Sequence, residues 1–564
     1  MDQKYTEYLK KYDFKHPIEY SKHKPLTRTV QEDLEINEDL SSNILNYIYN
    51  NDPENKSKYN LLLNKWSSLY SLDEQYLKDS QRVLKKYKYH KNNMDNFIDE
   101  YIDFKEEQNF LSKYQYVQFK RFQQLNTIVP FLQVLALYNF CTPLFSVLAP
   151  IIGLIIPYFV LYIKGLRLGF SQYILVVKNI IKNQYLIKGV LNLSKNSLQS
   201  NMYVITSIFF YFVSIYNNII SCFQFYKNTE FMIKFSDKYS GFLDQGETLI
   251  DSIYKCTRKR KTFLKFNKEM MNHKEKIVKM KTQLNNICDC KDKITKYGII
   301  GFLLKCNFDI YYDSQYDETV GFLFYLNNYN HDMHNVSSLL NDKRLNICHF
   351  KANAKPVIEG GYYLPHIADT KVTNDINLNK NLIITGPNAS GKTTLIKSTI
   401  LNLFLSQSMG CGCYSRCETP LYDYYHSYLN IPDTSNRDSL FQAEAKRCKE
   451  IIVFIEKHKT KKHFCIFDEI YSGTNPSDAV LCATIYLKGL NGYKECVDYA
   501  LTTHYIELCE NFEDNKWVVN KKMMVNQCKN GKLNYCYKIV DGISKINGGY
   551  QILEQLNYPK HLLK

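Results

Sequence analysis

The hydropathy pattern of the chain is dominated by one long apolar run. Between Arg121 and Lys164 lie 42 residues without a charged side chain or a histidine. A membrane-crossing helix needs about 20 apolar residues, so this run predicts a hairpin of two crossings with a tight turn near Asn139–Pro143. An apolar helical hairpin buried inside a soluble domain is the alternative, because Pro143, Pro150 and Pro157 interrupt the run.

Basic residues flank this apolar run on both sides, and they predict its orientation. They are Lys113, Lys120 and Arg121 before the run and Lys164, Arg167 and Lys178 after it. Because basic flanks stay on the cytosolic side, a hairpin would leave both of its ends in the cytosol. A second apolar stretch, Met202–Phe225, contains two asparagines and fits either a third membrane element or a buried core helix.

The rest of the pattern divides the chain into consecutive regions. Apolar residues at helical spacing amid many charges predict helices before and after the apolar run. The segment Lys355–His366 is the natural boundary of the next domain, with Gly360 and Gly361 as its hinge. We therefore expect four regions: a polar helical region at 1–121, the membrane hairpin at 122–163, a helical lever or core at 164–354, and an α/β domain at 355–564.

The chain is strongly basic, with 72 Lys and Arg against 56 Asp and Glu and a formal net charge of +16. Such a balance favours an acidic partner, either nucleic acid or an anionic membrane face, although the composition of an AT-rich genome would also enrich lysine. The densest basic cluster, Cys256–Lys265, fits a DNA phosphate contact, a solvated helix face or a membrane-surface contact.

Cysteine usage indicates a reducing compartment. The chain has 17 cysteines, an odd number, and its first residues are charged rather than resembling a secretory signal. Cys411, Cys413 and Cys417 suggest a zinc site, but no matching Cys/His pair follows at metal-binding spacing, which disfavours zinc.

The clearest chemical motif is the stretch Asn381–Thr394, which reads as an apolar strand, a glycine-rich turn and a helix entered at Lys392. Its spacing, G-x-x-x-x-G-K-[ST], is that of a phosphate-binding loop for ATP. Glycines let backbone N–H groups surround phosphate oxygens, the lysine reaches the β- and γ-phosphates, and the Thr393 hydroxyl ligates Mg²⁺. The predicted ATP-binding residues of this loop are Gly386, Pro387, Asn388, Ala389, Ser390, Gly391, Lys392, Thr393 and Thr394.

Two further strands end on residues that complete such a site. The strand before Asp468 and Glu469 places two carboxylates at its C-terminal end, and another strand ends at His504. We expect Asp468 to hold Mg²⁺, and Glu469 to orient and deprotonate the attacking water. His504 is placed to sense the γ-phosphate, so the predicted catalytic residues are Glu469, Lys392 and His504.

These motifs, GPNASGKTT, DEIYSGTN and TTHYIEL, resemble the ATPase domain of the MutS family over about Gly360–Leu556. The resemblance implies an α/β P-loop fold of the ABC type with a mixed sheet. It also implies that Asn374 in VTNDINL contacts the adenosine. Ser439 in DSLFQAE would act in trans on the γ-phosphate bound by a partner subunit, which makes a homodimer the expected assembly.

The function expected from these features is that of an ATP-hydrolysing, DNA-associated protein of the mismatch-repair and recombination family. It would be anchored in a membrane, with the ATPase domain in the cytosol and dimer closure moving helical levers. The alternatives are a nucleotide-switched membrane or scaffold protein without DNA binding, and a soluble cytoplasmic location. The first 121 residues offer no equivalent of the mismatch-reading domain of that family, and at most three crossings disfavour an ABC transporter.

Overall fold

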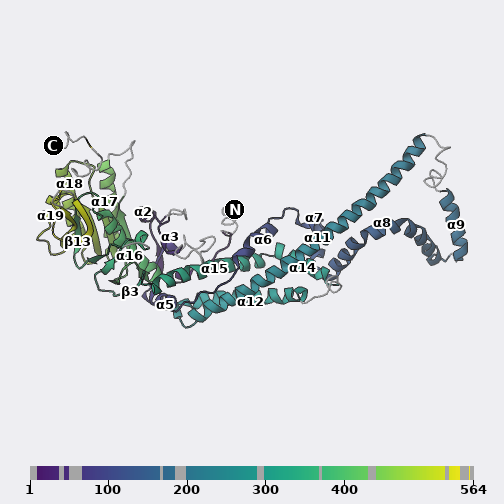
Figure 1. Cartoon of the computed structure of the whole chain (residues 1–564), viewed down its shortest axis with the longest axis horizontal. Coiled ribbons are helices and arrows are strands. Elements are labelled where there is room, and N and C mark those ends of the chain that lie inside the picture. Colours follow the sequence, from purple (N-terminus) through teal and green to yellow (C-terminus); the bar gives the residue numbers. More distant parts are fainter. Residues whose placement is uncertain are drawn as a thin grey trace. The chain divides into compact units, whose positions relative to one another are not determined.

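The computed structural model of the chain is shown in Figure 1. It describes residues 9, 11–36, 43–49, 66–165, 169–183, 198–288, 298–367, 371–429, 440–527, 533–546 and 558. The contacts among residues divide the chain into two compact units, and these units differ from the four consecutive regions expected from the sequence. The first unit comprises 1–95, 247–274 and 321–564, and the second comprises 96–246 and 275–320.

The first unit is built around a six-stranded mixed sheet, which confirms the expected α/β class. Its strand order is β13-β12-β6-β11-β10-β9, and all neighbours are parallel except β12 and β13. The strands are β6 (Asn381–Thr385), β9 (Tyr424–Tyr428), β10 (His463–Asp468), β11 (Val497–Thr503), β12 (Val518–Gln527) and β13 (Leu533–Asp541).

The middle strands of this sheet are buried along their whole length. Every residue of β6 and β11 is buried, as expected for parallel strands covered by helices on both faces. Alternate residues such as Ile383, Phe467 and Leu501 form one apolar core together with the helices α17, α18 and α19. The helices of this domain are α16 (Lys392–Met409), α17 (Leu440–Lys457), α18 (Pro476–Asn491) and α19 (Ile506–Glu510), with the 3₁₀ turn η4 (Leu364–His366).

A second, five-stranded sheet lies in the same unit, with the order β5-β4-β8-β3-β7. Its strands are β3 (Asn346–Phe350), β4 (Val357–Gly361), β5 (Asn374–Asn377), β7 (Cys411–Gly412) and β8 (Arg416–Thr419). Cys411, Cys413 and Cys417 are buried here, and burial raises the pKa of the Cys413 thiol to about 12. No group of three metal-binding side chains gathers in the part of the chain that the structure describes.

The N-terminal residues pack against the α/β domain. The Trp66 indole donates to the Ser408 carbonyl at 3.2 Å, and the Gln81 amide donates to the Cys348 and Gly410 carbonyls at 2.8 Å each. These donors satisfy carbonyls of α16 and of residues in or next to the second sheet, in agreement with the place of residues 1–95 in the first unit. The elements are η1 (Pro17–Tyr20), β1 (His23–Pro25), α2 (Arg28–Asp33), α3 (Asn46–Tyr49), β2 (Leu69–Ser71) and α5 (Glu74–Leu84).

The second unit is helical, as expected for the part of the chain before the α/β domain. Stacked aromatic rings form its core, for example Phe104 on Phe235 at 4.2 Å and Phe110 on Tyr311 at 3.9 Å between ring centroids. The elements that lie wholly or partly in it are α6 (Asp95–Lys105), α7 (Phe110–Lys113), η2 (Lys120–Thr127), α8 (Val129–Ile163), α9 (Phe170–Asn183), α11 (Leu198–Thr257), α12 (Leu264–Cys288), α14 (Ile300–Tyr312) and α15 (Ser314–Asn341).

The tight turn expected at Asn139–Pro143 is wrong, because α8 is one continuous helix of 35 residues with three prolines inside it. A proline removes the hydrogen bond to the carbonyl four residues earlier. Side chains replace two of these lost bonds: Thr142 Oγ1 donates to the Asn139 carbonyl at 2.9 Å, and the Tyr211 hydroxyl donates to the Ser146 carbonyl at 3.1 Å. The helix can therefore continue through its prolines.

The partner of α8 is the second apolar stretch, which begins α11. Besides Tyr211, Asn218 donates to the Ser146 hydroxyl, and the rings of Phe140 and Phe225 lie 5.0 Å apart. Among the described residues, two helical segments are long and apolar enough to cross a membrane, Val129–Gly153 and Ile205–Thr257, and only 6% and 0% of their most apolar windows are buried. Met202–Phe225 is consequently not a buried core helix.

Candidate active site

The glycine-rich loop joins β6 to α16 at the carboxyl edge of the six-stranded sheet, as the sequence predicts. Gly391 caps α16 with φ +90°, a left-handed conformation that residues with a side chain rarely adopt. Ala389 lies in the same region with φ +59°. Two left-handed residues in a short loop turn the backbone sharply into the start of the helix, where N–H groups are available to an anion.

Lys392 is buried and reaches across this loop. Its Nζ donates to the carbonyls of Gly386 at 3.0 Å and Pro387 at 3.3 Å, and it lies 3.6 Å from Glu469 Oε1. Burial lowers the pKa of the lysine, while the neighbouring carboxylates of Glu469 and Asp468 oppose that shift. Lys392 thus lies between the glycine-rich loop and the two acidic residues, Asp468 and Glu469.

Two oxygen ligands suitable for Mg²⁺ meet at the end of β10. Thr393 Oγ1 donates to Asp468 Oδ2 at 2.7 Å, and the Thr502 hydroxyl donates to the other oxygen of the same carboxylate. Mg²⁺ prefers oxygen ligands and keeps sites for water and phosphate, so a hydroxyl and a carboxylate from the protein fit that ion. Thr393 and Asp468 therefore form a donor set appropriate for Mg²⁺.

Glu469 and His504 follow directly after neighbouring parallel strands. Asp468 of β10 is opposite Thr502 of β11, so the residues after both strand ends lie at the same edge of the sheet. His504 Nε2 lies 2.7 Å from Glu469 Oε1 and 3.1 Å from Lys392 Nζ. The hydrogen bond with His504, followed by its charge and that of Lys392, holds the pKa of Glu469 below its usual value. Glu469 has φ +50°, an uncommon conformation for this residue type.

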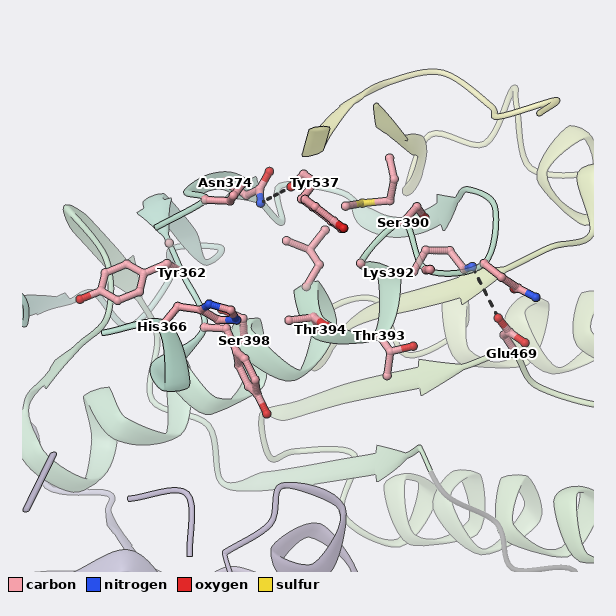
Figure 2. A pocket seen from close by; sticks show the side chains of 18 residues that line it. Tyr362, His366, Asn374, Ser390, Lys392, Thr393, Thr394, Ser398, Glu469 and Tyr537 are labelled. Carbon is pink, nitrogen blue, oxygen red and sulfur yellow. Dashed lines mark hydrogen bonds and ion pairs between the residues drawn. The ribbon is translucent and has the colours of Figure 1, made fainter. Parts of the chain in front are cut away.

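A cavity of about 660 Å³ opens beside the loop (Figure 2). Its lining includes seven of the predicted ATP-binding loop residues, Asn388 to Thr394, together with Glu469. Asn374 also lines it, but its amide is engaged with the backbone of β13: it donates to the Tyr537 carbonyl at 3.0 Å and accepts from Ile539 N–H at 2.8 Å. Asn374 therefore fastens β5 to β13 at the cavity wall.

Several cavity-lining residues carried no recognisable signal in the sequence. They are Tyr362, Tyr363, His366, Val372, Met523 and Tyr537. Aromatic and apolar side chains of this kind suit the base and sugar of a nucleotide. Of the other predicted site residues, Gly386 and Pro387 give their carbonyls to Lys392, and Ser439 lies outside the described residues.

A further acidic residue supports the segment that follows Glu469. The buried carboxylate of Glu444 in α17 accepts from the Ser472 N–H at 3.0 Å, the Ser472 hydroxyl at 2.9 Å and the Gly473 N–H at 3.1 Å. A Cβ on Gly473 would lie 2.7 Å from Leu440 Cγ, so only glycine permits this close approach of α17. The sequence placed Glu444 in the segment that contains Ser439 but gave it no role.

Comparison with known proteins adds to this geometry. Residues 382–564 match the family model described as MutS domain V. The chain is 28% identical over 223 residues to the DNA mismatch repair protein MutS of Listeria monocytogenes, covering 38% of this chain and 24% of that protein. It is 27% identical over 227 residues to the MutS of a Geobacillus species, covering 38% and 25%. The chain thus spans about a quarter of the length of the curated relatives it matches.

Proposed function

Because this chain is a MutS family protein through its C-terminal domain, we propose that it binds ATP with Mg²⁺ and hydrolyses it. MutS family proteins are ATPases, and the match covers only domain V, so the activity of this chain is our inference. The observation that carries it is the meeting of Lys392, Glu469 and His504 beside the loop Gly386–Thr394.

The proposed reaction assigns one task to each of these residues. The loop N–H groups and Lys392 bind the phosphate oxygens, and Lys392 stabilises negative charge on the transferring group. Glu469 orients a water molecule, accepts its proton as the oxygen attacks the γ-phosphorus, and ADP leaves. His504 holds Glu469 in its ionised form. Mg²⁺, which Thr393 and Asp468 would hold, supplies further neutralisation of phosphate charge.

A homodimer closed by ATP is the second part of the proposal. Ser439 would cap the nucleotide bound by the partner subunit, and closure around two nucleotides would move the attached helices. The resemblance of Asp438–Glu444 to the signature segment of the family supports this scheme. So does the packing of α17, which begins at Leu440, against the segment that follows Glu469.

Membrane anchoring by α8 and the first part of α11 is the third part. These helices expose many large apolar side chains, for example Ile151 at 53%, Phe209 at 61% and Phe212 at 63%. Water-soluble surfaces rarely carry apolar patches of that extent, whereas a bilayer covers them. Since α8 and α11 pack together, Lys120 and Arg121 before α8 and Lys227 after the apolar part of α11 would lie on one side, which we place in the cytosol with the ATPase domain. The basic residues that follow α8, such as Lys164, would lie at its other end.

We propose that DNA is the partner on which the movement of the attached helices acts. The relatives are named as DNA mismatch repair proteins, and the net charge of +16 favours a polyanion. A nucleotide-switched membrane or scaffold protein without DNA binding is the second candidate. The observation that favours it is the large exposed apolar surface of α8 and α11, which has no evident use in DNA binding.

The ATPase proposal is tested by the substitution Glu469→Gln in the full chain. The amide keeps the size of the side chain but cannot accept a proton, so ATP binding should persist while kcat falls by about 10²- to 10⁴-fold. Glu456→Gln, an exposed position on α17, is the matched control. Hydrolysis at the wild-type rate in the Glu469 variant would show that another group activates the water.

A further inference from the structure

Two short segments of the chain are dense in positive charge. Residues 80–94 contain five lysine or arginine residues and no acidic residue, and residues 252–268 contain seven and no acidic residue. Together these 32 positions hold twelve of the 72 Lys and Arg residues, about three times the average density along the chain. An even enrichment in lysine, as base composition alone would give, does not produce such a distribution.

The fold brings the two segments side by side within the first unit, at the end of α5 and the junction of α11 with α12 (Figure 1). Thr262 Oγ1 donates to Asp79 Oδ2 at 3.0 Å, and Thr248 Oγ1 lies 3.2 Å from His90 Nε2. We call their exposed cations the basic patch: Lys85, Lys86, Lys88, Lys91, Lys255, Arg258, Lys259, Lys261, Lys265 and Lys268.

These charges are not neutralised by the protein itself. Within the described ranges, no residue of the basic patch has an acidic side chain at ion-pair distance, whereas Arg82, at its border, pairs with Asp79 at 3.3 Å. Beside the patch, Nε of the half-buried Arg260 is enclosed by protein without an acceptor. Mutual repulsion of so many uncompensated cations destabilises the folded chain unless an anion binds there.

Helix ends explain only part of the patch. Lys85 and Lys86 follow the C-terminus of α5, and Arg258 and Lys259 follow that of α11, where cations interact favourably with the terminal carbonyls. Lys261 lies in η3 (Lys261–Phe263) and Lys265 in the first turn of α12, where the helix dipole disfavours a cation, and Lys268 lies one turn further along α12. Lys261 and Lys265 therefore oppose local stability, which is expected of residues kept for binding.

We propose that the basic patch binds the phosphodiester backbone of nucleic acid without regard to sequence. This assignment rests on the proposed DNA association, and it identifies the basic patch as the surface that contacts the DNA. Compact lysine charges are suited to phosphates. Membrane-surface binding instead combines cations with inserted apolar side chains, and Leu264 is the one large apolar residue exposed in these two segments.

The test is the triple variant Lys261→Glu, Lys265→Glu and Lys268→Glu in the full chain, purified in detergent. Acidic residues at the start of α12 suit the helix dipole, so the variant should fold at least as well as the wild type. Binding to a short fluorescein-labelled DNA duplex is followed by anisotropy at increasing NaCl concentration. We expect about tenfold weaker binding at low salt, and a log–log salt slope smaller by about 2.7, from about 0.9 per lost phosphate contact.

Three matched lysines outside the patch serve as the control: Lys380, Lys457 and Lys459, all exposed and each changed to glutamate. Equal loss in the control variant, or unchanged affinity and slope in the patch variant, overturns the proposal. Loss of binding to phosphatidylcholine vesicles containing phosphatidylglycerol, with duplex binding intact, also overturns it and assigns the patch to a lipid surface. ATP turnover, measured in parallel, should stay unchanged in the patch variant, so a failure of the ATPase proposal is recognised separately.

Discussion

Removal of the Glu444 carboxylate should weaken both the α/β domain and its catalysis. Glu444 is 2% exposed and accepts three hydrogen bonds from Ser472 and Gly473. Hydrogen bonds to a charged group contribute about 1.5–3 kcal/mol each, and they are not additive. Glu444→Ala should therefore lower the free energy of unfolding by about 3–5 kcal/mol. Glu444→Gln keeps one acceptor oxygen, enough for the two bonds from Ser472 but not for the bond from Gly473, and should cost about 1–2 kcal/mol.

The effect on turnover follows from the position of the supported segment. Ser472 lies three residues after Glu469, whose backbone has φ +50°, and Tyr471 between them has φ +60°. Such conformations persist only where the surroundings enforce them. A Glu469 carboxylate displaced by loosening of this segment would orient water poorly, and each 1.36 kcal/mol lost from the transition state is tenfold in rate. We expect kcat to fall about 10- to 100-fold in Glu444→Ala, with KM for ATP within about twofold.

The assay is steady-state ATPase activity at a temperature where circular dichroism shows each variant folded. Thermal unfolding is measured on the same samples, and Glu456→Gln is the control on the exposed face of α17. Rescue by Glu444→Gln, with a kcat close to the wild-type value, would assign the effect to the acceptor oxygens. A stable Glu444→Ala variant with an unchanged kcat would refute the reasoning, as would equal changes in kcat and KM.

Two further predictions concern the histidine beside Glu469 and the apolar helices. His504→Ala should raise the pKa of Glu469 toward its usual value. Because the carboxylate acts only when ionised, and activity is lost as pH falls through that pKa, the acid limb of the kcat profile should move to higher pH. The exposed His349→Ala is the control, and an unmoved limb contradicts the prediction. The double variant Ile151→Arg and Phe209→Arg should be released from membranes into carbonate extracts, because each arginine costs about 2.5–3.5 kcal/mol at the centre of a membrane-spanning helix. The control variant with leucine at both positions should stay with the membranes. Extraction of the wild-type chain itself would exclude the membrane anchor.

Much of the candidate site could be predicted because its signals are local. The strand, glycine-rich turn and helix around Lys392 occupy one short stretch of sequence, and the structure has them as β6, the loop and α16. Glu469 and His504 meet because residues after neighbouring parallel strands share one edge of a sheet. The contact of Asn374 with adenosine was predicted from the resemblance alone. In the structure, the Asn374 amide bonds to the backbone of β13, whose residues lie more than 160 positions later in the chain.

Long-range packing could not be predicted, because its signals are not local in the sequence. Trp66, Gln81 and Asp33 fasten the N-terminal residues to α16, the second sheet and β9, yet they lie in polar stretches with strands of only three residues. Nothing in their spacing distinguishes such contacts from a solvated helix face. Glu444 was likewise indistinguishable from the other acids of α17, because only the folded chain brings Ser472 and Gly473 to it.

The prolines of α8 show that the rule that proline ends a helix can mislead. A partner helix can supply the hydrogen bond that the proline removes. Proline breaks helices in water because the freed carbonyl and the ring are costly there. In α8, the carbonyl freed by Pro150 accepts the hydroxyl of Tyr211, a residue 65 positions away on α11. Asn218 donates to Ser146 at the same place, so polar groups gather between the two helices while apolar side chains face outward. Spanning helices need this arrangement, because a bilayer offers no water to an unpaired backbone group. We therefore place the proposed membrane hairpin between α8 and α11 rather than within 122–163, and this hairpin would also return the chain to the side on which it began.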